Sequence, residues 1–211
     1  MNILVLGPFR QKIFHNLRVE SIVNFLKKKK NNVIHSNKKI DINFTKKNSI
    51  EFIISNGYSH KIPSEVIKKF KGKCINLHNA LLPHGRGIGV NLFCLLKGLQ
   101  TGVSIHEVDA NWDTGDIIVT KKIDPKNDET FRLFYLRLLH ETNKLFFKNW
   151  QKIKFNKIKT LKQKRKFVDT TTRRRTEHLL EYFRYSYDIP IKEIKKFKKI
   201  YLNKKLFFKN I

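Results

Sequence analysis

Short apolar runs alternate with amphipathic stretches along roughly the first half of the chain. Continuous apolar runs bounded by turn residues predict buried strands at 2–6, 33–34, 51–55 and 73–77. Apolar residues at helical spacing predict helices from about residue 10, over 63–70 and over 90–98. Strands that alternate with helices favour an α/β domain with a largely parallel sheet.

The pattern changes further along the chain. Two strands predicted at 102–108 and 116–123 are separated by a loop rather than a helix, so we expect an antiparallel portion in the sheet. We expect a loop with one short helical turn at 36–50 and a second loop at 78–89. A long helix is expected at 128–154. Ligands of open α/β sheets bind outside the carboxyl ends of the strands, so the loops after Leu77 and Val108 are the candidate sites.

The composition divides the chain near residue 150. Residues 1–150 carry the α/β pattern, whereas 151–211 form a basic appendage with 20 Lys and Arg against 5 Asp and Glu. The appendage also carries several Tyr and Phe residues, and we expect mixed helix and strand in it. It would cover the core, make a dimer contact or bind a polyanion.

The whole chain has 45 Lys and Arg against 17 Asp and Glu, a net charge of +28. Such a charge attracts nucleic acid, an anionic membrane surface or an anionic substrate. However, 35 of the 45 basic residues are Lys, and Asn and Ile are abundant, which is typical of an AT-rich genome. Proteins that read nucleic-acid sequence depend more on Arg. We therefore expect no nucleic-acid partner, although the charge would still attract an anionic substrate.

We expect neither a membrane-spanning helix nor a secretory signal in this chain. No apolar run approaches the roughly 18 residues that a membrane helix needs, and the N-terminus lacks the pattern of a secretory signal. Cys74 and Cys94 form neither a CxxC pair nor a disulfide framework, which favours a reducing compartment. The sequence predicts a cytoplasmic protein with no membrane partner.

Three polar residues could form a catalytic group at the strand ends. Asn76 and His78 lie two apart at the end of a strand and so face the same side, and Asp113 lies in the second candidate loop. An amide can donate to a carbonyl oxygen that gains charge, an imidazole can move a proton, and a carboxylate can orient the imidazole. Spacing alone leaves a structural role for His78 open.

The sequence motifs around these residues are a more specific signal of function than their spacing. Asn-x-His-x-x-Leu-Leu-Pro, then Arg-Gly, then Gly-Val-Ser-Ile-His-x-x-Asp and Asp-Thr-Gly-Asp-Ile-Ile resemble the folate-dependent formyltransferase family over about residues 74–123. The resemblance implies a Rossmann-like formyltransferase core in which Asn76, His78 and Asp113 are catalytic. It implies 10-formyltetrahydrofolate as co-substrate, transfer of its formyl group to a primary amine, and no metal.

The same resemblance implies a pocket for the folate. The residues that match its lining are Ser55, Asn56, Gly57, Tyr58, Trp112 and Gly115. For Tyr58, packing in the core or in a lid is an equal alternative to a place beside the pterin. Trp112 stands where the family usually has an aliphatic residue, and it would pack on the folate or shield Asp113.

Residues for the second substrate are expected near the first strand and in the loop after Leu77. The candidates are Pro8, Phe9, Arg10, His84, Arg86 and Asn91. Arg86 would meet a phosphate or carboxylate, or would fix its loop through an ion pair. The segment from Gly7 to Arg10 is no Gly-rich phosphate cradle, which disfavours glycinamide ribonucleotide as the acceptor.

Three functions remain after this comparison of motifs. Phe-Ile-Ile-Ser-x-Gly-Tyr and the opening Asn-Ile-Leu-Val-Leu-Gly-Pro resemble the nucleotide-sugar branch, which implies a dTDP- or UDP-linked amino sugar as acceptor and a homodimer. The alternatives are a methionyl-tRNA formyltransferase and a non-catalytic basic module that binds nucleic acid on the same core. The resemblance implies a large C-terminal β-barrel domain in the methionyl-tRNA enzymes, and the 61 residues after residue 150 show no regular run of short strands, which disfavours the first alternative. The second is disfavoured because the three candidate catalytic residues are all present. The appendage would then serve dimerisation or acceptor binding.

Overall fold

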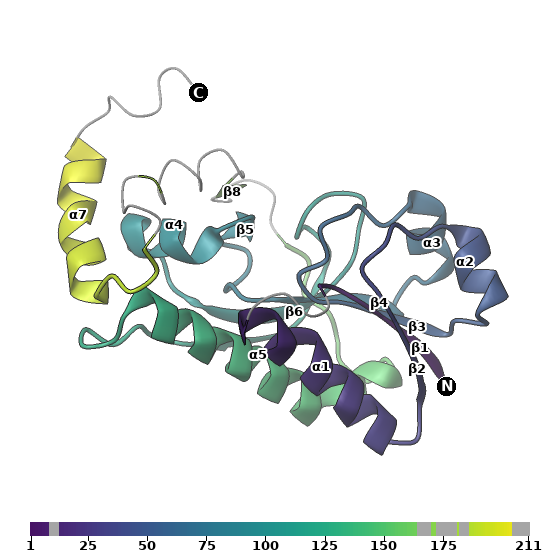
Figure 1. The fold of residues 1–211 in the computed structure, drawn as a ribbon. Coiled ribbons are helices and arrows are strands. Elements are labelled where there is room, and N and C mark those ends of the chain that lie inside the picture. The colour runs from purple at the N-terminus through teal and green to yellow at the C-terminus, as the bar shows by residue number, and fades with distance from the viewer. Residues whose placement is uncertain (9–12, 164–169, 172–180, 182–185, 204–211) are drawn as a thin grey trace.

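A six-stranded sheet forms the centre of the computed structural model, which describes residues 1–8, 13–163, 170–171, 181 and 186–203 (Figure 1). Its order is β2 (Asn32–Ser36), β1 (Asn2–Leu6), β3 (Phe52–Ser55), β4 (Cys74–His78), β6 (Gly102–Glu107) and β7 (Ile117–Lys122). The first four strands are parallel, and β6 joins β4 and β7 antiparallel. This confirms the Rossmann-like α/β class, the mostly parallel sheet and its antiparallel portion.

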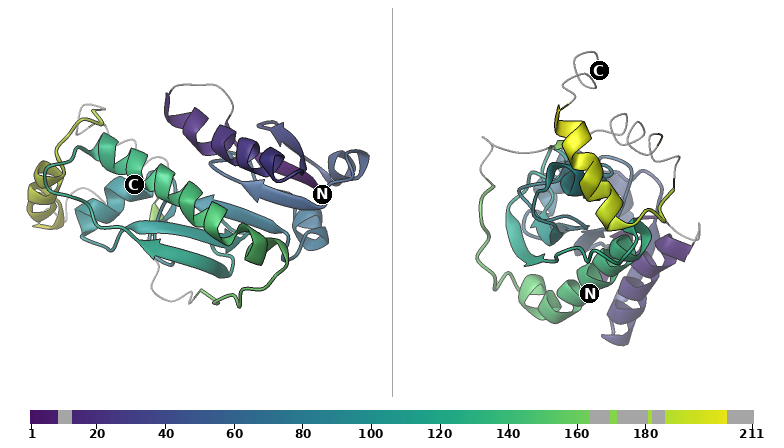
Figure 2. Two further views of the ribbon diagram at one scale, coloured as in Figure 1. Left: turned by 90° about the horizontal axis from the view of Figure 1, so that it is seen from below. Right: turned by 90° about the vertical axis from the view of Figure 1, so that its left-hand side faces the viewer.

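Helices cover both faces of the sheet. α1 (Ile13–Lys28) and α5 (Phe131–Lys154) lie side by side along one face, as Figures 1 and 2 show. Ile3 and Val5 of β1 point into the core on this side, whereas Leu4 points into a second core that includes Val66. This second core lies under α2 (Ile42–Lys47) and α3 (Ser64–Lys69). The alternation along β1 explains why a continuous apolar run forms a strand that is buried on both faces.

Two local features refine the predicted elements. The short helical turn expected within 36–50 is α2, whose N-cap is the Asp41 side chain, which accepts from the Phe44 N–H at 2.7 Å. The loop expected over 78–89 contains a two-residue strand, β5 (Arg86–Gly87), which pairs in parallel with β8 (Thr170–Thr171). A pair this short has no periodic signature in the sequence.

The C-terminal part of the chain packs on the α/β core. The predicted division after residue 150 falls inside α5, which continues to Lys154. α7 (Ile191–Asn203) lies beside α4 (Val90–Lys97) at one end of the protein (Figure 1), and Ile191 and Ile194 belong to the same apolar core as Ile3. Among the described helices, none combines the length and apolarity that crossing a bilayer requires.

Candidate active site

Asn76 and His78 lie at the carboxyl end of β4, as expected. The antiparallel pairing of β4 with β6 places His106 directly opposite Asn76. Asp113 comes from the loop between β6 and β7 and has a left-handed backbone, with φ of 55°. An Asp in this conformation is uncommon, and the contacts of its side chain and backbone hold it there.

The carboxylate of Asp113 is the centre of a hydrogen-bond network. Its Oδ1 accepts from Nδ2 of Asn76 at 3.1 Å, and its Oδ2 accepts from the backbone N–H of Gly87 at 2.9 Å. Nε2 of His106 lies 3.4 Å and Nδ1 of His78 lies 3.7 Å from Oδ1. The structure thus brings Asn76, His78 and Asp113 together in one cluster.

The hydrogen bonds of His78 define which ring nitrogen faces the cluster. Nε2 of His78 lies 2.8 Å from the backbone oxygen of Gly85, and a carbonyl oxygen can only accept, so Nε2 carries the proton. In the neutral ring, Nδ1 then presents a lone pair toward Asp113. A proton that reaches Nδ1 creates an imidazolium next to a carboxylate.

Burial and charge tune the two titratable partners in opposite ways. Burial lowers the pKa of His78, against the charge of Asp113, which raises it, and a neighbouring His106 lowers it further. Burial opposes ionisation of Asp113, but its interactions with His78, His106 and the backbone N–H of Gly87 together hold its pKa well below the usual range. At neutral pH the site therefore pairs an ionised carboxylate with a neutral imidazole.

His106, in the Gly-Val-Ser-Ile-His motif, is a functional candidate that sequence reasoning missed. Its Nδ1 donates to the backbone oxygen of Glu107 at 2.7 Å, which leaves Nε2 to accept from Nδ2 of Asn76 at 3.1 Å. The amide of Asn76 is thereby held between His106 and Asp113. Two features could have indicated that His106 faces Asn76: the period of two along the predicted strand at 102–108, and an antiparallel pairing of that strand with β4.

Gln163, from the C-terminal part of the chain, is a second residue that sequence reasoning missed. Its Oε1 accepts from Nε and Nη2 of Arg86, at 3.1 and 2.7 Å. Its Nε2 donates to the backbone oxygens of Asp113 and Gly115, at 3.1 and 2.6 Å. Gln163 therefore connects the loop that carries the carboxylate to the strand that carries Gly87.

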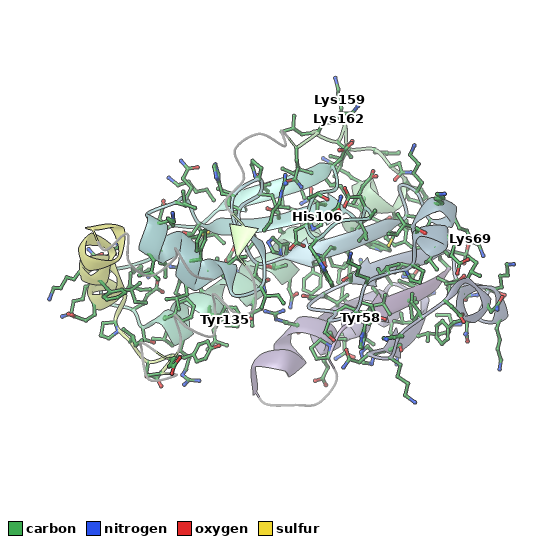
Figure 3. The ribbon with its side chains drawn as sticks, turned by 90° about the horizontal axis from the view of Figure 1, so that it is seen from above. Tyr58, Lys69, His106, Tyr135, Lys159 and Lys162 are labelled. Atoms are coloured by element: carbon green, nitrogen blue, oxygen red, sulfur yellow. The ribbon has the colours of Figure 1, made fainter. Side chains whose placement is uncertain are left out.

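A cavity of about 870 Å³ opens onto the cluster. This volume lies within the range of small-molecule sites. In Figure 3, Tyr135 lies below and to the left of His106 and Tyr58 lies below and to its right, and both line the cavity. Across the described ranges, no group of three or more His, Cys, Asp and Glu side chains could hold a metal ion.

The residues expected to hold the folate fall into two groups. Ser55, Gly57, Tyr58 and Trp112 line the cavity. The hydroxyl of Tyr58 donates to the backbone oxygen of Lys38 at 2.8 Å, which fixes the ring, whereas Trp112 is half exposed. Asn56 and Gly115 are buried behind the cavity wall and do not line it. These assignments stay predictions.

The residues expected to bind the second substrate are scattered. Arg86 and Asn91 line the cavity, and the buried Oδ1 of Asn91 has no hydrogen-bond partner among the described residues. Arg86 is 5% exposed, and its bonds to Gln163 fit the loop-fixing role. Pro8 and His84 lie outside the cavity lining, and Phe9 and Arg10 lie outside the described residues.

The Rossmann-like sheet, with an amide, an imidazole and a carboxylate at its strand ends, agrees with the resemblance of the sequence to the formyltransferases. The family model described as formyl transferase matches residues 12–149. The chain belongs to the formyl transferase family.

Among curated proteins, the methionyl-tRNA formyltransferase of Fusobacterium nucleatum is 32% identical over 119 residues, which are 56% of this chain and 38% of that protein. The GDP-perosamine N-formyltransferase of Brucella melitensis is 36% identical over 90 residues, which are 42% of this chain and 35% of that protein. The matched regions thus span less than half the length of these relatives.

Solved structures match more of the chain. The formyltransferase PseJ from Anoxybacillus kamchatkensis, in complex with UDP-4,6-dideoxy-4-formamido-L-AltNAc and tetrahydrofolate, has a TM-score of 0.82 and 31% identity. That match covers 92% of this chain and 97% of PseJ. The methionyl-tRNA formyltransferase from Clostridium thermocellum, at 22% identity and a TM-score of 0.65 over 89% of this chain and 82% of that chain, is similar in fold alone.

Proposed function

We propose that this protein transfers the formyl group of 10-formyltetrahydrofolate to the primary amine of a nucleotide-linked amino sugar, with a UDP- or dTDP-sugar as acceptor. The observation that carries the proposal is the likeness to PseJ, which runs through nearly the whole of both chains and includes the C-terminal part. PseJ was crystallised with a UDP-linked formamido sugar and tetrahydrofolate. The UDP-linked amino sugars are therefore the first acceptors to test.

His78 acts as the base in this proposal. The neutral imidazole, with its proton on Nε2, accepts the amine proton at Nδ1 while the new carbon–nitrogen bond forms. Asp113 stabilises the resulting imidazolium, whose Nδ1 faces its Oδ1 at 3.7 Å. The same proton then passes from His78 to the departing nitrogen of the folate, so that the base is regenerated and the proton balance closes.

Asn76 stabilises the charge that develops on the formyl oxygen. Its Nδ2 donates to Asp113 and to His106. An oxyanion formed near Nδ2 takes one of these two hydrogens, while the remaining bond keeps the amide oriented. A donor fixed before the reaction begins needs little reorganisation when the charge develops.

Methionyl-tRNA is the second candidate acceptor. Two observations favour it: the 32% identity to the Fusobacterium enzyme over 119 residues, and the net charge of +28. Phosphate contacts supply much of the affinity of proteins for nucleic acid. A non-catalytic module that binds nucleic acid remains a third alternative, against which the connected network of Asn76, His78 and Asp113 argues.

A coupled assay tests the proposal. 10-Formyltetrahydrofolate is supplied with a panel of UDP-, dTDP- and GDP-linked amino sugars, and with charged initiator tRNA in parallel. We expect turnover of a UDP- or dTDP-linked sugar with a KM that rises only severalfold between about 50 and 200 mM salt, because a diphosphate presents few charges. Formylation of tRNA that falls about a thousandfold over this range would replace our proposal with the second candidate.

Two variants show whether the observed turnover comes from this site. His78→Asn removes the base and should lower turnover about a hundredfold or more without loss of folding. The control is His140→Asn on the exposed face of α5, which should retain full turnover. Equal activity of the two variants would contradict the role of His78.

The homodimer and the cytoplasmic location stay predictions. Sedimentation of the purified protein tests the first, and fractionation of cells that produce it tests the second. The basic appendage at 151–211 stays assigned to dimerisation or acceptor binding.

A further inference from the structure

Arg18, in the first half of α1, extends its guanidinium to the wall of the cavity. Its Nη2 donates to the hydroxyl of Tyr135, and its Cζ lies 5.4 Å from the centre of that ring. Its Nη1 lies 2.5 Å from the point where a Cβ on residue 57 would stand. The guanidinium can occupy this place because residue 57 is a glycine.

The charge of Arg18 has no acidic partner among the described residues, since none of their carboxylates forms an ion pair with it. Its Nε is buried without a hydrogen-bond partner in the described part of the chain. Arg18 is half-buried, and removing part of a charge from water without an acidic partner is unfavourable. Arg132 offers a contrast on the neighbouring helix, because its Nε and Nη2 donate to the two carboxylate oxygens of Asp188, at 2.6 and 2.9 Å.

Arg18 lies close to the reaction centre. Its positive charge is one of the causes that lower the pKa of His78. Phe131, Tyr135 and Tyr187 line the cavity on the same side, and the rings of Phe131 and Tyr187 stack with centres 5.6 Å apart. This part of the cavity therefore combines one unpaired cation with a flat apolar wall.

We propose that Arg18 binds a phosphate oxygen of the acceptor's diphosphate and so positions the amino sugar for attack. The proposal rests on the proposed function and deepens it. A guanidinium is planar and donates from two edges, which suits phosphate oxygens, and Tyr135 holds it in one orientation. The sugar then extends from Arg18 toward His78, where the amine reacts.

A carboxylate of the folate glutamate is the other oxyanion that Arg18 could bind. The diphosphate is favoured because its two adjacent phosphates place several oxygens and two negative charges at the Nη1 side of the guanidinium, which Tyr135 does not occupy. Binding measurements with each substrate separately distinguish the two sources.

Calorimetric titration of the full chain is the experiment. UDP, dTDP and GDP are titrated alone into the wild type and into Arg18→Gln and Arg18→Lys, and 5-formyltetrahydrofolate is titrated into the same three proteins. We expect Arg18→Gln to raise the Kd of the preferred nucleotide about tenfold to a hundredfold, as for the loss of a charged hydrogen bond. Arg18→Lys should lose less, and the affinity for the folate should stay within about twofold.

The matched control is Lys27→Gln, which removes one positive charge from an exposed position on the same helix. It should bind the nucleotide as the wild type does, and this excludes a general effect of net charge. Thermal unfolding measurements show whether each variant is folded. If Arg18→Gln does not fold, the nucleotide affinity of Arg18→Lys supplies the result.

Three outcomes would overturn the proposal. These are nucleotide affinity unchanged in Arg18→Gln, loss of folate affinity in place of nucleotide affinity, and no measurable binding of any of the three nucleotides to the wild type. The proposed function fails separately: if no nucleotide-linked amino sugar is formylated while Arg18→Gln still loses nucleotide affinity, Arg18 remains a diphosphate ligand in a protein of other activity.

Discussion

The side-chain amide of Gln163 donates to the backbone oxygen of Asp113 at 3.1 Å, although 50 positions separate the two residues in the sequence. The same amide group donates to Gly115, and its oxygen accepts from Arg86. Asp113 has an unfavourable left-handed backbone, so its side chain keeps its place only while the surrounding loop is held. Gln163 is thus a positioning residue for the carboxylate.

We predict that Gln163→Ala lowers kcat about tenfold to a hundredfold with a small change in KM. A displacement of about 1 Å at a catalytic group has effects of this size. Steady-state kinetics with saturating folate measures the change. Lys162→Ala is the control, because Lys162 is exposed in the same segment and projects outward in Figure 3.

Gln163→Glu separates the two halves of this contact. Glutamate keeps an acceptor for Arg86 but has no hydrogen to donate to the oxygens of Asp113 and Gly115. We expect its kcat to be as low as that of Gln163→Ala. Wild-type kcat in the glutamate variant would show that Gln163 acts through Arg86 alone.

His106 is predicted to act through Asn76. His106→Leu removes the acceptor that holds the Asn76 amide and should lower kcat about a hundredfold, as loss of an oriented oxyanion donor does. His106→Gln offers an oxygen that can accept the same hydrogen and should recover part of the activity. Equal kcat for the two variants, with equal melting temperatures, would show that His106 only fills space.

Particular residues show what the sequence could and could not predict. β1 and β3 were predictable because both faces of each strand are buried, which produces an uninterrupted apolar run. The meeting of Asn76, His78 and Asp113 was expected from the strand-end rule and the family resemblance. Both signals are local or lie within short motifs.

The contacts that the sequence did not reveal depend on tertiary register. Gln163 is a single polar residue in an irregular segment, with no spacing that points to Asp113. Arg18 is on a helix whose apolar stripe was predicted, but its contact with Tyr135 requires α1 and α5 to lie side by side. Interactions between such distant positions leave no periodic trace in one sequence.

Gly115 offers a prediction on stability. A Cβ at this position would lie 1.9 Å from the backbone oxygen of Glu107, so the loop cannot accept a side chain without moving. We predict that Gly115→Ala lowers the free energy of unfolding by about 1–3 kcal/mol or more. Denaturant unfolding measures this, with Asn111→Ala as an exposed control in the same loop. Equal stability of the two variants would contradict the close approach.

The pH dependence of turnover tests the assignment of His78 as base. Burial lowers the pKa of His78 below its ordinary value of 6.5, so kcat should be constant above that pH and should fall only at lower pH, when Nδ1 becomes protonated. The charge of Asp113 raises this pKa. Asp113→Asn should therefore shift the acid limb to still lower pH, while its plateau falls about a hundredfold or more because the imidazolium is no longer stabilised. An acid limb that moves to higher pH in Asp113→Asn would assign the proton transfer to another group. An acid limb that is the same in His78→Asn as in the wild type would do so too.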